Sequence, residues 1–421
     1  MAERSEAVEE QAVRDGSTAY AVKPESATAE DVPLGYKRTE VGVIPDDWEV
    51  RALRDLSIMK SGESITSAKI NDSSPYPCYG GNGLRGFTSR YTHDGDHVLI
   101  GRQGALCGNV VRAEGRFYAS EHAVVTTAKR DCDTDWLSYV LDSMQLNRLS
   151  ESSAQPGLSV QKVLSLQTAI PSSLKEQRAI ATALSDADAL IESLDRLIAK
   201  KRAIKQAAMQ QLITGQTRLP GFTGEWETKR LGDISTIAMG RTPSRNNTAF
   251  WGRGHVWLSI ADLHSKVVKK SKEQITDLAA AGMTPIPEGT LLMSFKLSIG
   301  RLCFAGCDLF TNEAICSFTD LQADEEFIYY ALSRTDFSLY GKQAVKGYTL
   351  NSESLKLVKV FLPPEDEQIA IATVLSDMDT EIEALEHRRD KARQIKQGMM
   401  QQLLTGRVRL VDPESSKEAT A

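Results

Sequence analysis

The feature that most constrains this chain is an internal repeat. Residues 176–219 align with residues 367–410 at a constant shift of 191 positions and without a gap. The matching positions include a Glu-Gln pair near the start of each copy, a Leu-Ser-Asp run in the middle and a Thr-Gly pair near the end. Such similarity within one chain predicts a structural unit that is used twice. Because a solenoid needs about three or more units, the repeat predicts a molecule of two equivalent halves.

The segments that precede the two copies match only at their ends. Trp226-Glu227 has its counterpart in Trp48-Glu49, at a shift of 178 positions rather than 191. The stretches in between therefore differ in length, and most of their sequence differs as well. A chain with two similar repeated segments and two different stretches preceding them is better suited to recognising two different targets than to catalysing one reaction twice.

Each copy has the periodicity of a long helix, expected over about residues 175–213 in the first copy. Apolar residues recur at alternating steps of four and three, which is the a/d pattern of a coiled coil. Gly215 and Gly406 lie just past the last apolar turn, where helices commonly end. Pairing the two helices with each other would cover both stripes, and antiparallel pairing would relate the halves by a pseudo-two-fold axis. The first stripe is Ile180, Leu184, Ala187, Ile191, Leu194 and Ile198, and the second is Ile371, Leu375, Met378, Ile382 and Leu385, with Arg389 at the position that closes it.

The variable segments are expected to be rich in β-structure. Short apolar runs bounded by Gly, Asp and Asn predict strands at 98–100, 123–125 and 291–293, and short helices are expected at 136–149 and 325–339. The predicted fold class is α+β, with two similar domains joined by two long antiparallel helices that form a coiled coil. The predicted organisation is a disordered acidic leader (1–34), a first domain (35–170), a first spacer helix (171–218), a second domain (219–362), a second spacer helix (363–410) and a disordered tail (411–421).

The formal net charge of −6 is concentrated at the two ends of the chain. The leader has eight acidic and three basic residues and the tail has three acidic and one basic, so the body, 35–410, carries a net charge of +1. This balance gives no positive support for a nucleic-acid partner, although a near-neutral body can concentrate positive charge on one face. The sequence contains no apolar run of about 18 residues, so no membrane-spanning helix is predicted. The six cysteines form no CxxC pair and are expected to be free thiols in the cytoplasm.

Two motifs lack the context that their chemistry needs. Residues 81–86 match GxGxxG, but a dinucleotide site requires a strand before the motif and a helix after it, and the flanking residues favour neither. A polar loop that displays Asn82 and Arg85 is the better interpretation. His93 and His97 are spaced i,i+4 without a third ligand, so a solvated pair is favoured over a metal site. The sequence also contains no phosphate-binding P-loop.

The polar loops are more informative. Residues 102–104 follow a predicted strand, and residues 240–247 offer two arginines and two asparagines in an irregular stretch. Arginine pairs well with guanine O6 and N7, and asparagine or glutamine with adenine N6 and N7. Phosphate contacts and ordinary surface use the same residue types, so a solvated turn remains the alternative for each residue. The candidate DNA-contacting residues are Asn82, Arg85, Arg102, Gln103, Arg241, Thr242, Ser244, Arg245, Asn246, Lys296 and Tyr348. No catalytic or metal-ligating residue is predicted.

Several separated motifs resemble one known family, the specificity subunits of type I restriction–modification systems. Residues 37–50, which end in Trp48-Glu49-Val50, resemble the opening of these subunits. Residues 211–227 resemble the junction after their first helix, and residues 363–368 resemble the entry to their second. Residues 79–83 and 100–104 are similar to one common class of recognition domain. The resemblance covers essentially all of the body, whereas the acidic leader has no place in the usual pattern.

The resemblance implies two target-recognition domains, each binding one half of a split site in double-stranded DNA and held apart by the paired helices. It also implies a chain with no catalytic centre and no cofactor of its own. The implied partners are two methyltransferase subunits, which use S-adenosylmethionine to methylate adenine N6, and restriction subunits, which translocate and cut DNA with ATP and Mg²⁺. The sequence has no N/D-P-P-Y/F methylation motif, which agrees with this division.

Two alternatives come from other classes of protein. A coiled-coil scaffold would bind protein partners only, and DNA binding by the complete complex would exclude it. An enzyme with two tandem catalytic domains would need the same catalytic residues at equivalent positions. The alignment of His122 with Glu313, and of Arg102 with Ser294, speaks against that enzyme.

Overall fold

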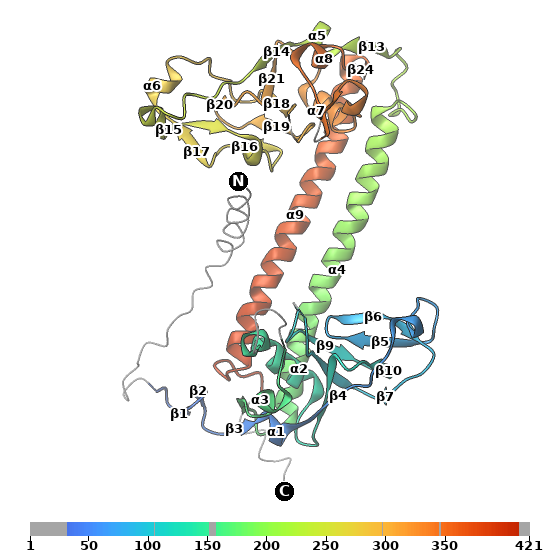
Figure 1. Ribbon diagram of the computed structural model, residues 1–421, viewed down its shortest axis with the longest axis vertical. Coiled ribbons are helices and arrows are strands. Elements are labelled where there is room, and N and C mark those ends of the chain that lie inside the picture. The colour runs from blue at the N-terminus through green and yellow to red at the C-terminus, as the bar shows by residue number, and fades with distance from the viewer. Residues whose placement is uncertain (1–31, 105, 151–156, 297, 345–346, 412–421) are drawn as a thin grey trace, which may run out of the picture. The chain divides into compact units, whose positions relative to one another are not determined.

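The computed structural model (Figure 1) describes residues 32–104, 106–150, 157–296, 298–344 and 347–411. The predicted leader, 1–34, lies outside the described residues except for its last three, and the predicted tail, 411–421, lies outside them except for its first. In the part of the chain that is described, no helix is long and apolar enough to cross a membrane. All six cysteines are free, as predicted.

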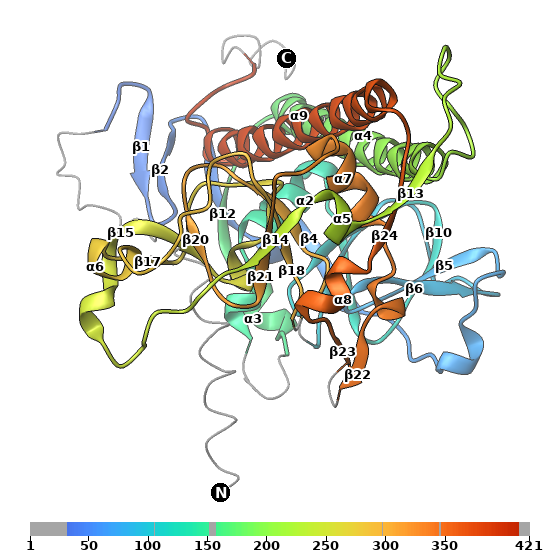
Figure 2. The same cartoon turned by 90° about the horizontal axis from the view of Figure 1, so that it is seen from above.

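Each repeated segment forms one long helix. Helix α4 covers Leu174–Ile213 and helix α9 covers Glu365–Leu403, and the two lie side by side in Figures 1 and 2. The bounds predicted for the first helix differ from the observed ones by a single residue. The predicted glycines lie just past both helix ends, and Gly215 and Gly406 have φ of +67° and +70°. Glycine adopts this left-handed conformation without steric cost, which lets the chain leave the helix.

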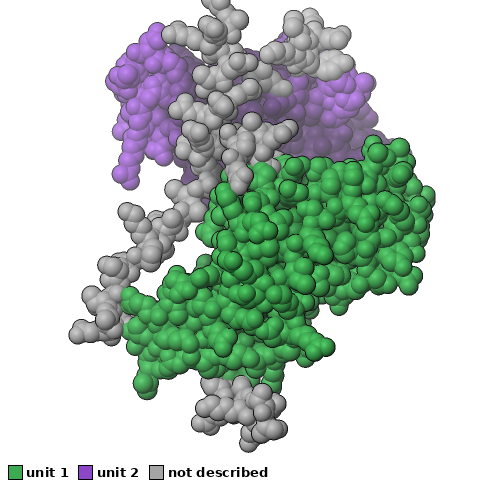
Figure 3. All heavy atoms as spheres, turned by 60° about the horizontal axis from the view of Figure 1, so that its bottom comes forward, with its two compact units in different colours: residues 1–191, 391–421 green, residues 192–390 purple. Residues whose placement is uncertain are grey.

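The chain divides into two compact units, coloured separately in Figure 3. Unit 1 consists of residues 1–191 and 391–421, and unit 2 consists of residues 192–390. Each unit therefore contains one variable segment, the start of one long helix and the end of the other.

The predicted apolar faces of the long helices are buried or half-buried. In unit 1, Ile180 and Leu184 near the start of α4 share a core with Leu403 at the end of α9. In unit 2, Ile371 near the start of α9 shares a core with Leu212 at the end of α4. Start packs against end in both units, so the predicted antiparallel pairing is confirmed. Leu194, Ile198, Leu375 and Ile382 are also buried, and Ala187, Ile191, Met378, Leu385 and Arg389 are half-buried.

An aspartate on a long helix forms polar contacts both with its domain and with the other long helix. In unit 2, the Tyr330 hydroxyl donates a hydrogen bond to Asp379 of α9 at 2.7 Å, and Asp379 also forms an ion pair with Lys205 of α4. Unit 1 has the same arrangement at the positions that the repeat predicts, formed by Tyr139, Asp188 and Lys396. Because a carboxylate here bonds to both a domain and the opposite helix, it ties three elements together.

The variable segment of unit 1 forms an α+β domain. Its strands are β1 (Tyr36–Thr39), β2 (Gly42–Pro45), β3 (Glu49–Ala52), β4 (Ser57–Ser61), β5 (Tyr76–Gly80), β6 (Gly83–Thr88), β7 (His93–Asp94), β8 (His97–Gly101), β9 (Val110–Ala113), β10 (Arg116–Ala119), β11 (Ala123–Ala128) and β12 (Gln167–Ile170). Its helices are α1 (Leu53–Leu56), α2 (Thr134–Ser143) and α3 (Val160–Leu164), with short 3₁₀ turns η2 (Ser67–Lys69) and η3 (Leu146–Leu149). The central sheet has the order β4-β11-β8-β9, and a second sheet has the order β6-β5-β10-β7. The predicted strands 98–100 and 123–125 are parts of β8 and β11.

The variable segment of unit 2 has a similar order of elements near its start and its end, but its middle part differs. Its strands are β13 (Glu227–Arg230), β14 (Thr236–Met239), β15 (Trp251–Leu258), β16 (Val267–Val268), β17 (Glu273–Ile275), β18 (Leu291–Ser294), β19 (Leu302–Ala305), β20 (Phe310–Thr311), β21 (Ile315–Thr319), β22 (Lys342–Ala344), β23 (Gly347–Thr349) and β24 (Lys359–Leu362). Its helices are α5 (Leu231–Ile234), α6 (Asp277–Ala280), α7 (Glu325–Ser333) and α8 (Ser352–Lys356), with 3₁₀ turns η4 (Thr248–Phe250), η5 (Ile260–Asp262) and η6 (Phe337–Leu339). The central sheet has the order β14-β21-β18-β19-β16, and the predicted strand 291–293 lies in β18.

The predicted short helices are shorter than expected. The helix expected at 136–149 begins earlier, because Asp133 caps it by accepting hydrogen bonds from two backbone N–H groups, and it ends at Ser143. Gln145 then takes a left-handed φ of +48°, which breaks the helix before the separate turn η3. The helix expected at 325–339 likewise stops at Ser333 before the separate turn η6. The GxGxxG motif lies in the turn and second strand of the β5-β6 hairpin. A strand therefore does precede it, contrary to the expectation, but another strand and not a helix follows.

Backbone hydrogen bonds define which residues of the two domains are equivalent. The N–H of Arg102 donates to the carbonyl of His122 at 2.8 Å, and the N–H of Phe295 donates to the carbonyl of Ala314 at 3.0 Å. Each bond joins the residue after one central strand to the residue before the neighbouring strand. Arg102 is therefore equivalent to Phe295, and His122 to Ala314.

The sequence alignment of Arg102 with Ser294, and of His122 with Glu313, is thus wrong by one residue. The two variable segments have loops of different length, so a shift read from the helices does not hold inside the sheets. The corrected register instead makes Glu121 equivalent to Glu313. The two domains do share a carboxylate at this position, and its hydrogen bonds are described below.

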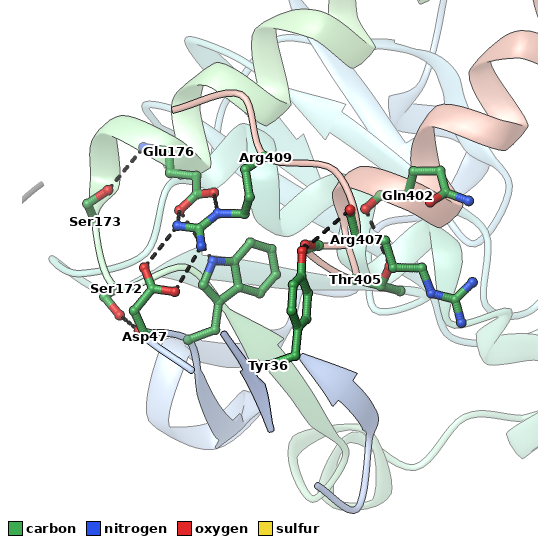
Figure 4. Close-up of polar contacts among 11 residues, drawn as sticks. Tyr36, Asp47, Ser172, Ser173, Glu176, Gln402, Thr405, Arg407 and Arg409 are labelled. Carbon is green, nitrogen blue, oxygen red and sulfur yellow. Dashed lines mark hydrogen bonds and ion pairs between the residues drawn. The ribbon is translucent and has the colours of Figure 1, made fainter. Parts of the chain in front are cut away.

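An arginine just past the end of α9 closes unit 1 (Figure 4). Arg409 donates hydrogen bonds to both carboxylate oxygens of Glu176 and, at 2.9 Å each, to both of Asp47. Glu176 is only 1% exposed and also accepts a hydrogen bond from the Trp48 indole at 3.3 Å. Burial works against the charged guanidinium, but the bonds to Asp47 and Glu176 outweigh it, so the pKa of Arg409 is raised.

Unit 2 has the equivalent contact past the end of α4. Arg218 donates to the buried Glu367 at 2.9 Å, and the Trp226 indole donates to the same carboxylate at 3.1 Å. A buried carboxylate is costly without a charged partner. This cost explains why the glutamate, the tryptophan and the arginine recur in both halves of the sequence.

The glutamine of the repeated Glu-Gln pair has a separate structural role. The side-chain oxygen of Gln177 accepts a hydrogen bond from the N–H of Asp133 at 2.8 Å, and that of Gln368 accepts one from the N–H of Asp324 at 2.9 Å. Asp133 and Asp324 cap the N-termini of α2 and α7. Each glutamine therefore anchors a domain helix to the first turn of a long helix.

Candidate nucleic-acid interface

Four of the predicted residues lie on neighbouring loops of unit 1, which we call the first loop cluster. Asn82 lies in the turn between β5 and β6, Arg85 lies on β6, and Arg102 and Gln103 follow β8. Asn82, Arg85 and Gln103 are exposed and Arg102 is half-buried. The fold thus brings together residues that come from two separate stretches of the sequence.

Glycines permit the close approach of these loops. A Cβ atom on Gly81 would lie 2.8 Å from the carbonyl oxygen of Gln103, and one on Gly101 would overlap the carbonyl of Gly81. A Cβ atom on Gly80 would overlap the side chain of Arg85. Real Cβ atoms do not approach backbone atoms so closely, so only glycine fits at positions 81 and 101, where two backbones meet, whereas the Arg85 side chain beside Gly80 could move.

Arg102 has spare hydrogen-bonding capacity. Its guanidinium donates to the Ser61 hydroxyl at 3.1 Å, and no carboxylate among the described residues forms an ion pair with it. A guanidinium has five N–H donors in a planar fork. The remaining donors suit a bidentate acceptor such as a guanine edge or a phosphate.

The second loop cluster lies in unit 2 and consists of Arg241, Thr242, Ser244, Arg245 and Asn246. These residues follow β14 without regular structure, and all but the half-buried Thr242 are exposed. The N–H of Arg241 donates to the carbonyl of Thr311 at 2.8 Å, which fixes where the loop leaves the sheet. Five of the predicted residues therefore lie together on one fixed loop.

Arg245 is already engaged within the protein. Its guanidinium donates two hydrogen bonds to the Glu273 carboxylate, at 2.6 and 2.9 Å, and lies 3.8 Å from the centre of the Trp251 ring. The hydrogen bond from Arg245 lowers the pKa of Glu273 below its usual value, although partial burial opposes this. The ring of Trp257 lies on the same guanidinium at 5.2 Å. Arg245 thus shapes the loop, and Arg241 is the more available of its two arginines.

The other members of the second loop cluster differ in their contacts. Thr242 donates a hydrogen bond to Glu313, and the carbonyl of Ser244 accepts one from the Trp251 indole at 3.1 Å. Asn246 is exposed.

Lys296 and Tyr348 lie elsewhere in unit 2, outside the second loop cluster. Lys296 follows β18 and is exposed. Its charge helps to lower the pKa of Glu313, after the larger effects of the hydrogen bonds from Thr242 and from the Glu313 backbone. Tyr348 lies on β23, and its side chain lies outside the described residues.

Sequence reasoning missed the equivalent glutamates. Glu121 accepts a hydrogen bond from the backbone N–H of Ile65 at 3.3 Å, and Glu313 accepts one from Thr242. Both donors lie on the loop that follows the first strand of a central sheet. The two glutamates follow Ser120 and Asn312 in the sequence. Their equivalence becomes visible only after the alignment of the two variable segments is corrected by one residue.

The histidine pair belongs to an aromatic cluster. His93 stacks on Phe117 with ring centres 5.4 Å apart, and the His93 and His97 rings meet edge to face at 5.6 Å. Over the described ranges of the chain, no group of three or more His, Cys, Asp and Glu side chains is placed to hold a metal ion.

Comparison with known proteins finds one family that is similar to both halves of the chain. The family model described as "Type I restriction modification DNA specificity domain" matches residues 45–200 and 223–394. The specificity subunit of the EcoprrI type I restriction enzyme from Escherichia coli is 42% identical over 39% of this chain and 40% of that protein. A putative MjaX specificity subunit from Methanocaldococcus jannaschii is 24% identical over 89% of this chain and 97% of that protein.

Solved structures have the same fold. The S subunit of a type I restriction–modification system from M. genitalium aligns over 85% of this chain and 96% of its own length, with a TM-score of 0.62 and 17% identity. A chain from a structure of the type I R-M system concerned with complex assembly and conformational transition aligns over 87% of this chain and 99% of its own, with a TM-score of 0.55. The family model covers well over half of the chain in two separate blocks, one for each repeat. The chain therefore belongs to the family of type I restriction–modification DNA specificity subunits.

Proposed function

We propose that this chain recognises an asymmetric, bipartite site in double-stranded DNA, with one half-site bound by each unit. The proposal rests mainly on one observation, namely that the two units share a frame and differ in their loop clusters. Arg102 of the first loop cluster is equivalent to Phe295 in unit 2, and Arg241 is equivalent to Glu63 in unit 1. Because donors, acceptors and apolar groups distinguish base pairs in the major groove, two different loop clusters select two different sequences.

We further propose that catalysis belongs to partner subunits. In this proposal two methyltransferase subunits methylate adenine with S-adenosylmethionine, and restriction subunits use ATP and Mg²⁺, while this chain binds no cofactor and works in the cytoplasm. Family membership supports this role. So does the likeness to a chain from a structure of complex assembly in a type I system.

The test is methylation of DNA libraries by the complete complex, with each half-site randomised separately. We expect methylation at a site with two unlike halves and a fixed spacer. Two identical half-sites would contradict the asymmetric site. Methylation by the purified chain alone would contradict the division of catalysis.

The same experiment separates this function from that of a scaffold. A scaffold would assemble the partners without changing which DNA they modify. Exchange of residues 35–170 for the equivalent segment of a related subunit should replace one half-site and leave the other unchanged. An unchanged site would favour the scaffold.

A further inference from the structure

A basic hollow lies on unit 2, between β16 and β17, and has no part in the recognition proposed so far. Its walls include Lys269, Lys270 and Lys272, together with His264. The nine residues from His264 to Lys272 contain four lysines and no acidic residue. The segment therefore carries a local excess of positive charge.

The three lysines of the hollow are not neutralised. Lys266, the fourth lysine of the stretch, pairs with Glu326 at 2.6 Å and so is satisfied internally. Lys269, Lys270 and Lys272 are exposed, and none of them forms an ion pair with a carboxylate that the structure describes. The charge of Lys272 also helps to lower the pKa of the adjacent Glu273, after the larger effect of the hydrogen bond from Arg245. The three ammonium groups still outnumber the carboxylates beside them, and such an excess of positive charge attracts a polyanion.

The only carboxylate in the hollow is already fully used. Asp262 is 6% exposed. It accepts hydrogen bonds from the N–H and hydroxyl of Ser259 at 2.8 and 2.7 Å, and from the N–H of Lys272 at 2.9 Å. Because both oxygens of Asp262 already accept hydrogen bonds from the backbone N–H groups of Ser259 and Lys272 and from the Ser259 hydroxyl, Asp262 does not pair with the lysine ammonium groups. These groups remain available to an external anion.

The backbone that carries the lysines is fixed. The N–H of Gly306 donates to the carbonyl of Val268 at 2.9 Å, and a Cβ atom on Gly306 would lie 2.5 Å from the Cγ of Lys269. On the other side, the Ser271 hydroxyl accepts from the N–H of Trp257 at 3.2 Å and donates to the carbonyl of Glu273 at 2.5 Å. The lysines therefore extend from a segment that is held at both ends.

The hollow is joined to the second loop cluster through two residues. Glu273, the residue after Lys272, binds Arg245 with both carboxylate oxygens. The Trp257 indole donates to the carbonyl of Arg241 at 3.1 Å, while its backbone N–H is held by Ser271. The basic hollow and the candidate base-contacting loop thus share a support within unit 2.

We propose that Lys269, Lys270 and Lys272 bind phosphates of the DNA backbone beside the half-site of unit 2. This inference rests on the proposed function, because it names the surface that holds the DNA while the second loop cluster selects its sequence. A lysine ammonium is a compact point charge that binds phosphate without discriminating between bases. The hollow accordingly contributes affinity and orientation, and it leaves base preference to the loop cluster.

The test compares two triple variants of the complete methyltransferase complex. The first is Lys269→Gln, Lys270→Gln and Lys272→Gln. The control is Lys229→Gln, Lys356→Gln and Lys359→Gln, which removes the same charge from exposed lysines on β13, α8 and β24. DNA affinity is measured from 50 to 200 mM salt, and base preference is measured with the half-site libraries. Thermal melting of each variant checks that the fold is retained.

Each phosphate contact contributes about 0.9 to the slope of log affinity against log salt. We expect the first variant to lower this slope by about 2 to 3, to bind all sequences more weakly and to keep both half-site preferences, while the control keeps the wild-type slope. An unchanged slope, an equal change in the control, or loss of partner assembly in place of DNA affinity would overturn the proposal. Failure of the wild-type complex to select any DNA sequence would instead overturn the proposed function itself.

Discussion

Glu121 and Glu313 lie at the same position of the two domains, and each accepts a hydrogen bond from the loop that follows the first strand of a central sheet. The donor is the Ile65 N–H in unit 1 and the Thr242 hydroxyl in unit 2. A carboxylate beside a DNA-binding loop repels phosphate, so a merely solvated glutamate would weaken binding here. We infer that each glutamate positions the loop that follows the first strand, which in unit 2 is the candidate DNA-contacting loop of the second loop cluster.

Replacement of Glu313 by Ala should therefore weaken discrimination in the half-site of unit 2 only. A hydrogen bond to a charged group contributes about 1.5–3 kcal/mol when buried, and this exposed bond should contribute about 1 kcal/mol, or roughly fivefold in selectivity. Library methylation measures the change. Glu288→Ala removes an exposed glutamate of the same unit as a control. A change in both half-sites would refute the positioning role.

The ion pair between Glu273 and Arg245 should respond to pH in a defined direction. Because the pKa of Glu273 is lowered in the folded protein, the pair stabilises the loop above the unfolded pKa of about 4.3. That stabilisation is lost as the pH falls through the lower folded pKa. Arg245→Gln should return the pKa of Glu273 towards its usual value, as measured by NMR titration of the side-chain carboxyl. The hypothesis fails if Glu273 titrates identically in both proteins.

Recognition should be divided between the two loop clusters. Arg102→Ala or Gln103→Ala should relax only the half-site of unit 1, and Arg241→Ala or Asn246→Ala only that of unit 2. A bidentate base contact accounts for about 1–3 kcal/mol of discrimination, which corresponds to about 5- to 150-fold in library methylation. If a residue contacts phosphate instead, its replacement will weaken all sequences alike. Altered preference in both half-sites after Arg102→Ala would show that the division is wrong.

Arg409→Ala should destabilise unit 1 strongly. The change leaves Glu176, which is 1% exposed, without its charged partner, and loss of one partner from a buried ion pair costs about 3–5 kcal/mol. The melting temperature of unit 1 should fall by roughly 10 °C. Arg407→Ala, which changes an exposed arginine two residues away, is the matched control. Similar melting of both variants would mean that the buried pair contributes little.

Helical periodicity and the repeat were sufficient to predict the long helices, their glycine ends and the antiparallel pairing. The repeat includes both Glu176 and Arg409, but only the structure shows that the two residues contact each other. The positions inside the domains could not be aligned, because loops of different length shift the register between Arg102 and Phe295. The pairing of Arg245 with Glu273 was also beyond the sequence, since it depends on how two loops 28 residues apart are folded together.

The long helices should set the distance between the half-sites. Four residues inserted after Ile198 add one turn to α4, or about 6 Å at ~1.5 Å per residue. A matching insertion after Leu385, which faces Ile198 in the antiparallel pair, keeps the two helices in step. An insertion in α4 alone would shift ion pairs such as that between Arg389 and Asp195 out of register. With base pairs rising about 3.4 Å, the preferred spacer should grow by about one or two pairs.

Methylation of substrates with graded spacers measures this change, and both half-site sequences should stay the same. The control inserts the same four residues after Gly221, an exposed turn position with φ of +93° outside both helices. That insertion lengthens the chain without lengthening a helix, so its spacer should not change. A spacer that stays fixed in the double insertion, while the complex remains active, would show that the helices do not determine the distance between the half-sites.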